Sequence, residues 1–286
     1  MKNTYKQKKT KWVILFSAFT LLLPLSYWGQ NSAPGDSIFI SSLVKFYQSR
    51  CGNSLKGDLY QSHAVDSPYI YVYVSPSNKV ENALKNSGYF LFCNHNMKKA
   101  LHYDSLYSDV NECFIYTTAA NASTRLTSEL LQYRKETQAF IVFHELTHVL
   151  LNSINSKLTY TVNEAVCDVV GNYLCREYAL SNKALNLKVV DAQIQLNEHL
   201  YNLFNSTILR INSNANQKPM AVKFLSKELS RTLVKADAFQ KQRFNYPVNN
   251  AYLLKNSFYS ENYYFYKQKL VFNRQLPPDL RDILKK

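Results

Sequence analysis

The sequence predicts an α+β fold in which a small sheet and one buried helix precede a mainly helical half. Residues 69–75, YIYVYVS, combine aromatic and β-branched side chains in the way typical of a strand. Residues 130–143 contain no glycine or proline and end in an apolar run, which predicts a buried helix. Beyond Asn182 the apolar residues recur at helical spacing. A chain of 286 residues is long enough to enclose one core of this kind.

Local signals place the remaining elements in order along the chain. Residues 37–48 form an amphipathic segment that we expect to lie against the domain or the membrane. Residues 79–86 are expected to form a helix that ends at Gly88. Strands are predicted at 69–75, 89–93 and 112–118, and helices at 162–180, 188–211, 221–240 and 249–267, with a last turn after Pro277 and Pro278.

The first eleven residues contain five lysines and no acidic residue, and residues 12–28 are almost wholly apolar. This pattern is typical of either a cleaved signal peptide or an uncleaved signal anchor. We favour the anchor, because cleavage after Ala33 would leave Pro34 as the first mature residue. The protein would then be a single-pass protein of the cell (inner) membrane, with its domain on the periplasmic or extracellular side.

The predicted organisation follows from that anchor. Residues 1–36 comprise a basic tail, the anchor and a linker at 30–36, and residues 37–286 form the domain. Within the domain, residues 37–153 hold the sheet and the buried helix, and residues 154–286 form the helical half.

The motif FHELTHVLL, residues 143–151, places two histidines four positions apart with a glutamate directly after the first. Residues four apart lie on the same face of a helix, so His144 and His148 can direct both imidazoles at one metal ion. Glu145 lies about 100° further round the helix, where it can reach a water molecule on that ion without being a ligand. The spacing predicts a zinc-hydrolase site with Glu145 as the general base.

A third ligand is expected from a second helix, in the segment TVNEAVCDVVG. Glu164 and Asp168 lie four residues apart there and so share a face. Glu164 can complete the metal site, while Asp168 can accept the N–H of a ligand histidine and fix its tautomer. A Glu/Asp pair on a helix is often solvated, but the apolar neighbours of this pair argue against an exposed face.

HELTH followed by NEAVCDVVG resembles the glutamate-zincins, the thermolysin-like metallopeptidases with the pattern HExxH and then NExxxD. The short interval between the two halves is more similar to a family of bacterial membrane-anchored proteins described as predicted aminopeptidases. That family also carries a C-terminal pair of asparagines with a tyrosine ten positions after the first, matched by Asn249, Asn250, Ala251, Leu253 and Tyr259. The resemblance extends from Phe140 to the C-terminus, and upstream of Phe140 the likeness is poor.

The resemblance implies a zincin-like fold with Zn²⁺ as the cofactor. The ligands would be His144, His148 and Glu164, which leave a fourth position for water. The resemblance also implies a donor for the oxyanion of the tetrahedral intermediate, and Tyr259 is the candidate because of its place in the matching segment. Tyr259 can equally be a core residue of a tyrosine-rich helix, and Tyr252 and His199 are the next candidates.

The function expected from these residues is that of a zinc metallopeptidase acting on a peptide or protein substrate. That it is an aminopeptidase rests on the resemblance alone, because no residue can be identified that would grip the α-ammonium group of a substrate. An endopeptidase and a catalytically silent pseudo-peptidase that binds partners at the membrane remain alternatives. The presence of Glu145 beside a complete set of ligands favours an enzyme.

The formal net charge of +14 points to an anionic partner. No nucleic-acid recognition motif is present, so we expect no nucleic acid and favour anionic lipid headgroups beside the membrane. Apart from the N-terminal lysines, the basic residues cluster at Lys218, Lys223, Lys227, Arg231, Lys235, Lys241 and Arg243.

The five cysteines allow at most two disulfides in an exported chain. Cys93 and Cys113, on neighbouring predicted strands, are the plausible pair. Cys167 and Cys175 cannot pair with each other, because eight residues of helix separate them by about 12 Å. The chain has no CxxC motif, so cysteine is not expected to ligate zinc.

Overall fold

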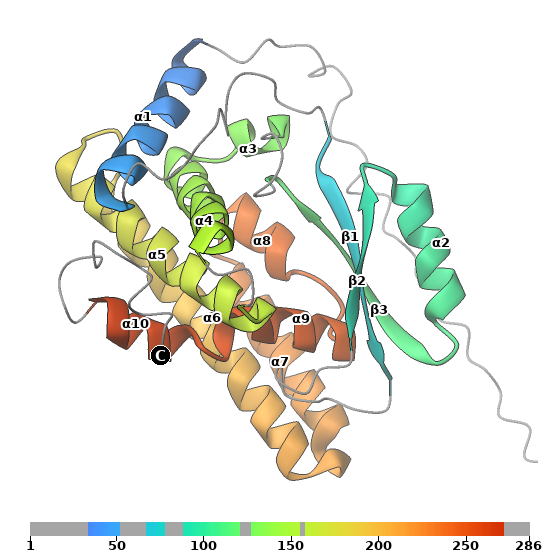
Figure 1. Ribbon diagram of the computed structural model, residues 1–286. Helices are drawn as coiled ribbons and strands as arrows, with labels where there is room; N and C mark the ends of the chain where they lie inside the picture. The colour runs from blue at the N-terminus through green and yellow to red at the C-terminus, as the bar shows by residue number, and fades with distance from the viewer. Residues whose placement is uncertain (1–33, 52–66, 78–87, 121–126, 155–157, 272–286) are drawn as a thin grey trace, which may run out of the picture.

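The computed structural model describes residues 34–51, 67–77, 88–120, 127–154 and 158–271. Within these ranges a small sheet with one outer helix lies beside a larger helical body (Figure 1). The predicted α+β class, with a small sheet before a mainly helical half, is confirmed.

The sheet has three antiparallel strands in the order β2-β1-β3, so the first strand in the chain lies at the centre. The strands are β1 (Tyr69–Pro76), β2 (Tyr89–Asn94) and β3 (Asn111–Thr118), which agree with the predicted ranges to within one residue at each end. Val72 faces Leu91 on one side and Ile115 on the other.

The two faces of β1 bury different kinds of side chain, as the alternation in YIYVYV predicts. Ile70, Val72 and Val74 form a small apolar core with Ala100 of helix α2 (Met97–Tyr107). Tyr73 points the other way and packs edge-on against Phe258 of helix α9 (Asn250–Ser260). The sheet therefore lies between α2 and the helical body (Figure 1).

Helix α2 is an element that the sequence reading did not anticipate. It begins after Asn96, whose side chain accepts a hydrogen bond from the backbone N–H of Lys99 at 2.9 Å. Ala100 is its one fully enclosed residue, and the rest of the helix is half-buried or exposed. So short an apolar face gives a weak periodic signal.

Helix α1 (Pro34–Cys51) packs on the helical body through Leu43 and Tyr47, which are fully buried. Residues 37–48 were expected to lie against either the domain or the membrane. The buried Leu43 and Tyr47 show that this segment lies against the domain. The helix also begins earlier than predicted, since residues 34–36 belong to it and not to a linker. Proline is well suited to a first helical turn, because its missing N–H would have no partner there.

The predicted helix at 130–143 is interrupted and then continues further than expected. Helix α3 (Ser128–Gln132) ends at Tyr133, which is extended, and helix α4 (Lys135–Ile154) follows. The side-chain amide of Gln138 donates to the carbonyls of Leu131 and Tyr133 and so satisfies backbone acceptors at the break.

The helical half contains two further breaks. Asp237 interrupts the predicted helix at 221–240, because its side chain caps a new helix by accepting from the Gln240 N–H at 2.9 Å. The helix predicted at 249–267 is interrupted at residues 261 and 262. The observed helices are α5 (Tyr160–Ser181), α6 (Leu187–Ser213), the 3₁₀ turn η4 (Ala215–Gln217), α7 (Lys218–Leu233), α8 (Ala238–Phe244), α9 and α10 (Tyr263–Val271).

All five cysteines are free thiols, so the expected Cys93–Cys113 bridge is wrong. The two residues lie on β2 and β3, which are separated by β1. Along β1 they are also out of register, since Cys113 faces Val74 whereas Cys93 lies at the bulge beside Ile70 and Tyr71. Two strand spacings of about 4.8 Å each already exceed the Cα separation that a disulfide allows.

Three predictions fall outside the described residues: the helix at 79–86, the apolar span at 12–28 and the turn after Pro277 and Pro278. Among the helices that the structure does describe, none has the length and apolar character required to cross a membrane.

Helices α4 and α5 approach each other closely at Gly171. A Cβ atom added there would lie 3.3 Å from the carbonyl oxygen of Phe140 and 3.4 Å from the backbone nitrogen of His144. Backbone atoms cannot move aside as a flexible side chain can. The absence of a side chain at Gly171 therefore sets the spacing of the two helices beside His144.

Gly171→Val should lower the free energy of unfolding by about 1–3 kcal/mol, because the larger side chain must push α4 away from α5. Urea denaturation of the full-length protein measures this change. Leu180→Val is the matched control, since it places the same β-branched side chain on an exposed position of α5. Equal losses in the two variants would show that the close approach is unimportant.

Candidate metal centre

Three of the predicted residues lie together between α4 and α5. His144 and His148 come from successive turns of α4, and Glu164 comes from the first half of α5. The two Nε2 atoms are 3.0 Å apart, and the Glu164 carboxylate oxygens lie 3.5 Å from His144 Nε2 and 3.6 Å from His148 Nε2. The three side chains thus point at one spot and form a group that could hold a metal ion.

The other nitrogen of each imidazole is occupied. His144 Nδ1 lies 2.8 Å from Asp168 Oδ1, and His148 Nδ1 lies 2.8 Å from Asn163 Oδ1. Since both partners are acceptors, each histidine directs an Nδ1–H at its partner and leaves Nε2 facing the shared spot. Asp168 therefore lies where the sequence predicted it. Asn163 was not anticipated, although it is the asparagine of the NExxxD pattern.

The chemistry of these atoms fits a divalent cation. The two imidazole Nε2 atoms face each other, and both oxygens of the buried Glu164 carboxylate lie beside them. Ligands of a tetrahedral zinc ion would be about 3.3–3.6 Å apart, given bonds of about 2.0–2.2 Å. The two nitrogen–oxygen distances agree with this range, and the nitrogen–nitrogen distance is slightly shorter. The group can therefore hold a metal, and its identity as zinc remains a proposal.

Buried charges set the protonation of the candidate ligands. Burial alone would lower the pKa of His144, but hydrogen bonds to Asp168 and Glu164 outweigh it and raise the pKa to about 10. Burial would likewise raise the pKa of Glu164, yet the nearby histidines hold it well below its usual range. A carboxylate that stays ionised in the interior is a strong metal ligand, and metal would compete with the proton on the histidine.

Asp168 is fully buried and has partners on both sides. Besides His144 it accepts hydrogen bonds from the hydroxyl of Tyr201 on α6 and from Arg243 Nη2 on α8, the latter at 3.3 Å. Burial would raise the pKa of Asp168, but Arg243 reverses this effect and lowers it. Asp168 thus remains ionised and can orient the His144 ring.

Arg243 corrects one expectation from the sequence. It was grouped with a basic stripe facing lipid, yet its guanidinium is largely buried, pairs with Asp168 and lies 4.2 Å from the centre of the Tyr259 ring. The remaining basic residues of the stripe after Lys218, namely Lys223, Lys227, Arg231, Lys235 and Lys241, are exposed. Sequence spacing could not distinguish the buried Arg243 from these exposed residues, because its partner Asp168 lies 75 positions away in the chain.

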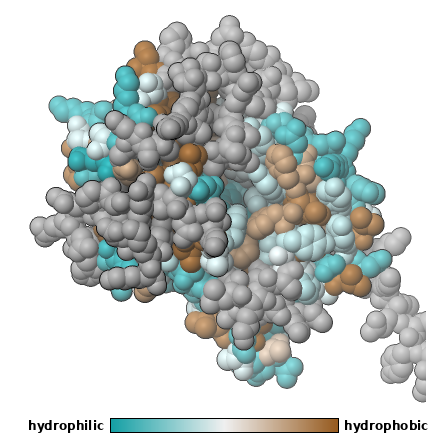
Figure 2. Space-filling view, viewed as in Figure 1, coloured by the Kyte–Doolittle hydropathy of each residue, from teal (hydrophilic) through white to brown (hydrophobic). Residues whose placement is uncertain are grey.

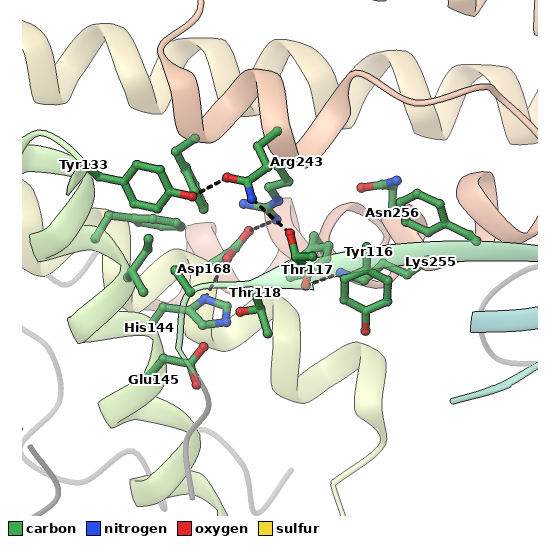
Figure 3. Close-up of a pocket in the computed structure, with 17 residues that line it drawn as sticks. Tyr116, Thr117, Thr118, Tyr133, His144, Glu145, Asp168, Arg243, Lys255 and Asn256 are labelled. Atoms are coloured by element: carbon green, nitrogen blue, oxygen red, sulfur yellow. Dashed lines mark hydrogen bonds and ion pairs between the residues drawn. The ribbon is translucent and has the colours of Figure 1, made fainter. Parts of the chain in front are cut away.

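A pocket opens beside the candidate metal centre, between α4 and the end of β3. Figure 2 shows a recess on this side of the molecule, with apolar residues over the sheet side. His144 and Glu145 form one wall, and Figure 3 shows the Glu145 carboxylate next to the His144 ring. The other lining residues include six aromatic side chains, Phe114, Tyr116, Tyr133, Phe140, Phe239 and Tyr259.

The candidates for an oxyanion donor take different places. Tyr259 lines the pocket, with its ring centre 6.4 Å from that of His144, and its hydroxyl accepts a hydrogen bond from Lys255. Burial raises the pKa of Tyr259 well above its usual value, so the phenol keeps its proton. Tyr252 is fully buried and donates to the carbonyl of Phe244 at 2.7 Å. His199 is exposed on α6.

His148→Ala should abolish metal binding, because two of three protein ligands cannot complete the site. Elemental analysis of the full-length protein should give one zinc ion per wild-type chain and none in the variant, which should also unfold at a lower temperature. His199→Ala is the matched control, since it removes an exposed histidine from α6. Equal metal content in His148→Ala and wild type would exclude this ligand set.

No known protein family, curated protein or solved structure matches the chain.

Proposed function

We propose that this protein is a zinc-dependent metallopeptidase of the glutamate-zincin type. The observation that supports it most directly is the convergence of His144, His148 and Glu164 on one spot, with Glu145 on the wall of the adjoining pocket. A metal held only for structure would need no carboxylate beside it facing a pocket. The combination of an open site and a nearby base is that of a hydrolase.

In this proposal the ligands are His144, His148 and Glu164. A zinc ion bound by them would act as a Lewis acid and lower the pKa of water toward about 7. Glu145 would take a proton from the attacking water and pass it to the nitrogen of the leaving amine. Asp168 and Asn163 would keep the two imidazoles in the tautomer that presents Nε2.

Tyr259 would donate a hydrogen bond to the carbonyl oxygen of the scissile bond as negative charge develops on it. Because Lys255 donates to the Tyr259 oxygen, the phenolic proton of Tyr259 is left for another acceptor. Tyr252 is a poorer candidate, since its proton is already used within the core. His199 is a poorer one still, because it is exposed on α6 rather than part of the pocket lining.

The setting we propose is the outer face of a cell membrane, with residues 12–28 as the anchor. The exposed lysines and arginines on and after α7 would then face anionic headgroups. The substrate would be a peptide or protein. A pseudo-peptidase that only binds partners is the alternative, and it does not explain why Glu145 is retained beside a complete ligand set.

Glu145→Gln should keep the metal but lose hydrolysis, because the amide has the same shape and cannot accept the proton. We expect kcat/KM on a peptide library to fall by at least about 10²-fold, as for loss of a general base. Glu228→Gln is the matched control, because Glu228 pairs with Arg231 on α7 and is not part of the pocket lining. Undiminished turnover in Glu145→Gln would remove this residue from the mechanism.

Tyr259→Phe should lower kcat by about 10²–10³-fold with little change in KM or metal content, the signature of a contact made in the transition state. Tyr252→Phe is the comparison, since loss of its hydrogen bond to Phe244 should reduce thermal stability and leave kcat near wild type. If Tyr259→Phe retains full kcat while Tyr252→Phe does not, the two assignments must be exchanged.

A further inference from the structure

The pocket contains a buried lysine that forms no ion pair at salt-bridge distance with any of the described residues. Lys255, on α9, is only 5% exposed and lines the pocket with Glu145 and His144. Its amine contacts the Tyr259 hydroxyl and lies over two aromatic rings, 4.0 Å from the centre of Tyr259 and 4.6 Å from that of Tyr116. Figure 3 shows the side chain extending from α9 toward the part of the pocket that holds His144.

No carboxylate of the described residues lies within ion-pair distance of Lys255. Asp168 is bonded to His144, Tyr201 and Arg243, and Glu164 faces the two histidines. Burial accordingly lowers the pKa of Lys255 to about 7, even though Glu164 favours the charged form. A lysine in such a place is poorly compensated in the free protein, and a bound anion would stabilise its charged form.

The charges around the pocket indicate which sign of ligand it accepts. With a divalent cation bound, its ligands His144 and His148 would be neutral. The cation, Arg243 and a charged Lys255 would then carry one more positive charge than the negative charges of Glu145, Glu164 and Asp168. A pocket of that sign favours an anionic ligand group over an ammonium group.

We propose that Lys255 binds the free C-terminal carboxylate of the substrate, so that the enzyme removes the last residue from peptides. This inference rests on the proposed peptidase function and replaces the aminopeptidase specificity expected from the resemblance. An aminopeptidase needs a spare carboxylate for the α-ammonium group. Glu145 and Asp168 are the two carboxylates lining the described pocket, and both already have roles in the site.

The position of Lys255 suits this role. The centre of the Tyr259 ring lies 6.4 Å from the centre of the His144 ring and 4.0 Å from Lys255 Nζ, so the amine is close to the candidate metal centre. A terminal carboxylate is one residue, about 3.8 Å of chain, beyond the scissile carbonyl. One residue can therefore connect the carbonyl near Tyr259 to the amine of Lys255.

The walls of the pocket add a preference for the side chain of that residue. Phe114, Phe140 and Phe239 line it together with the tyrosines, and apolar rings of this kind favour an apolar or aromatic side chain. The expected substrate is therefore a peptide that ends in an apolar or aromatic residue with a free carboxylate.

Binding can be measured without turnover in the zinc-loaded, full-length Glu145→Gln protein. The probes are N-acetyl-Ala-Phe and the same compound with a C-terminal amide, compared by calorimetry. We expect the acid to bind at least tenfold more tightly than the amide. Adding Lys255→Met should bring the two affinities together, whereas Lys255→Arg should keep the difference because it keeps the charge.

Lys241→Met is the matched control, since it removes an exposed lysine from α8 and should leave the preference for the acid unchanged. Methionine has nearly the volume of lysine, so Lys255→Met should fold, as zinc content and thermal unfolding will show. Lys255→Gln supplies a second neutral variant. Equal binding of acid and amide, or a preference that survives both neutral variants, would overturn the proposal.

Cleavage by the wild-type protein separates this inference from the proposed function. Release of phenylalanine from N-acetyl-Ala-Phe, but not of phenylalanine amide from Ala-Phe amide, would support both. Release from Ala-Phe amide alone would overturn the role of Lys255 and leave a peptidase. A Lys255-dependent preference in binding without cleavage of any peptide would instead overturn the peptidase and leave a carboxylate site.

Discussion

The ion-pair contact between His144 and Asp168 joins the two helices on which the candidate site depends. It runs from α4 to α5 at 2.8 Å, in a region where Gly171 lets the two backbones come close together. Asp168 has no exposure to solvent, so its charge must be balanced by protein groups. The candidate ligands on the two helices are therefore held by the same contact that joins α5 to α4.

The groups that balance the charge of Asp168 come from distant parts of the chain. Asp168 is bonded to Tyr201 of α6 and Arg243 of α8, and Arg243 lies over the ring of Tyr259 on α9. A short α8 that starts anew at Asp237, in place of one long helix, directs the guanidinium to this place. The interrupted helices of the C-terminal half thus supply the support of the site and one wall of the pocket.

The sequence identified the parts of the site that local spacing determines. His144 and His148 are one helical turn apart, as are Glu164 and Asp168, so helix geometry alone predicted which side chains could converge. Arg243 and Lys255 are also on helices, but Asp168, which pairs with Arg243, and Tyr116, whose ring lies under the Lys255 amine, are far away in the chain. Their exposure depends on which helix covers them, which periodicity does not encode. The breaks near Tyr133 and Asp237 contain no glycine or proline and depend on side-chain caps, so they were missed.

The five cysteines of the fold are free thiols, and burial limits their reactivity. Burial raises the pKa of Cys51 to about 12 and that of Cys113 to about 11, and it raises the pKa of Cys93 and Cys167 as well. The thiolate is the form that attacks disulfides and oxidants, so these cysteines react slowly. Cys167 is enclosed between α4 and α5, where its thiol donates to Asn163 Oδ1. The described fold therefore owes none of its stability to a disulfide, and burial keeps these four thiols in the protonated form that reacts least.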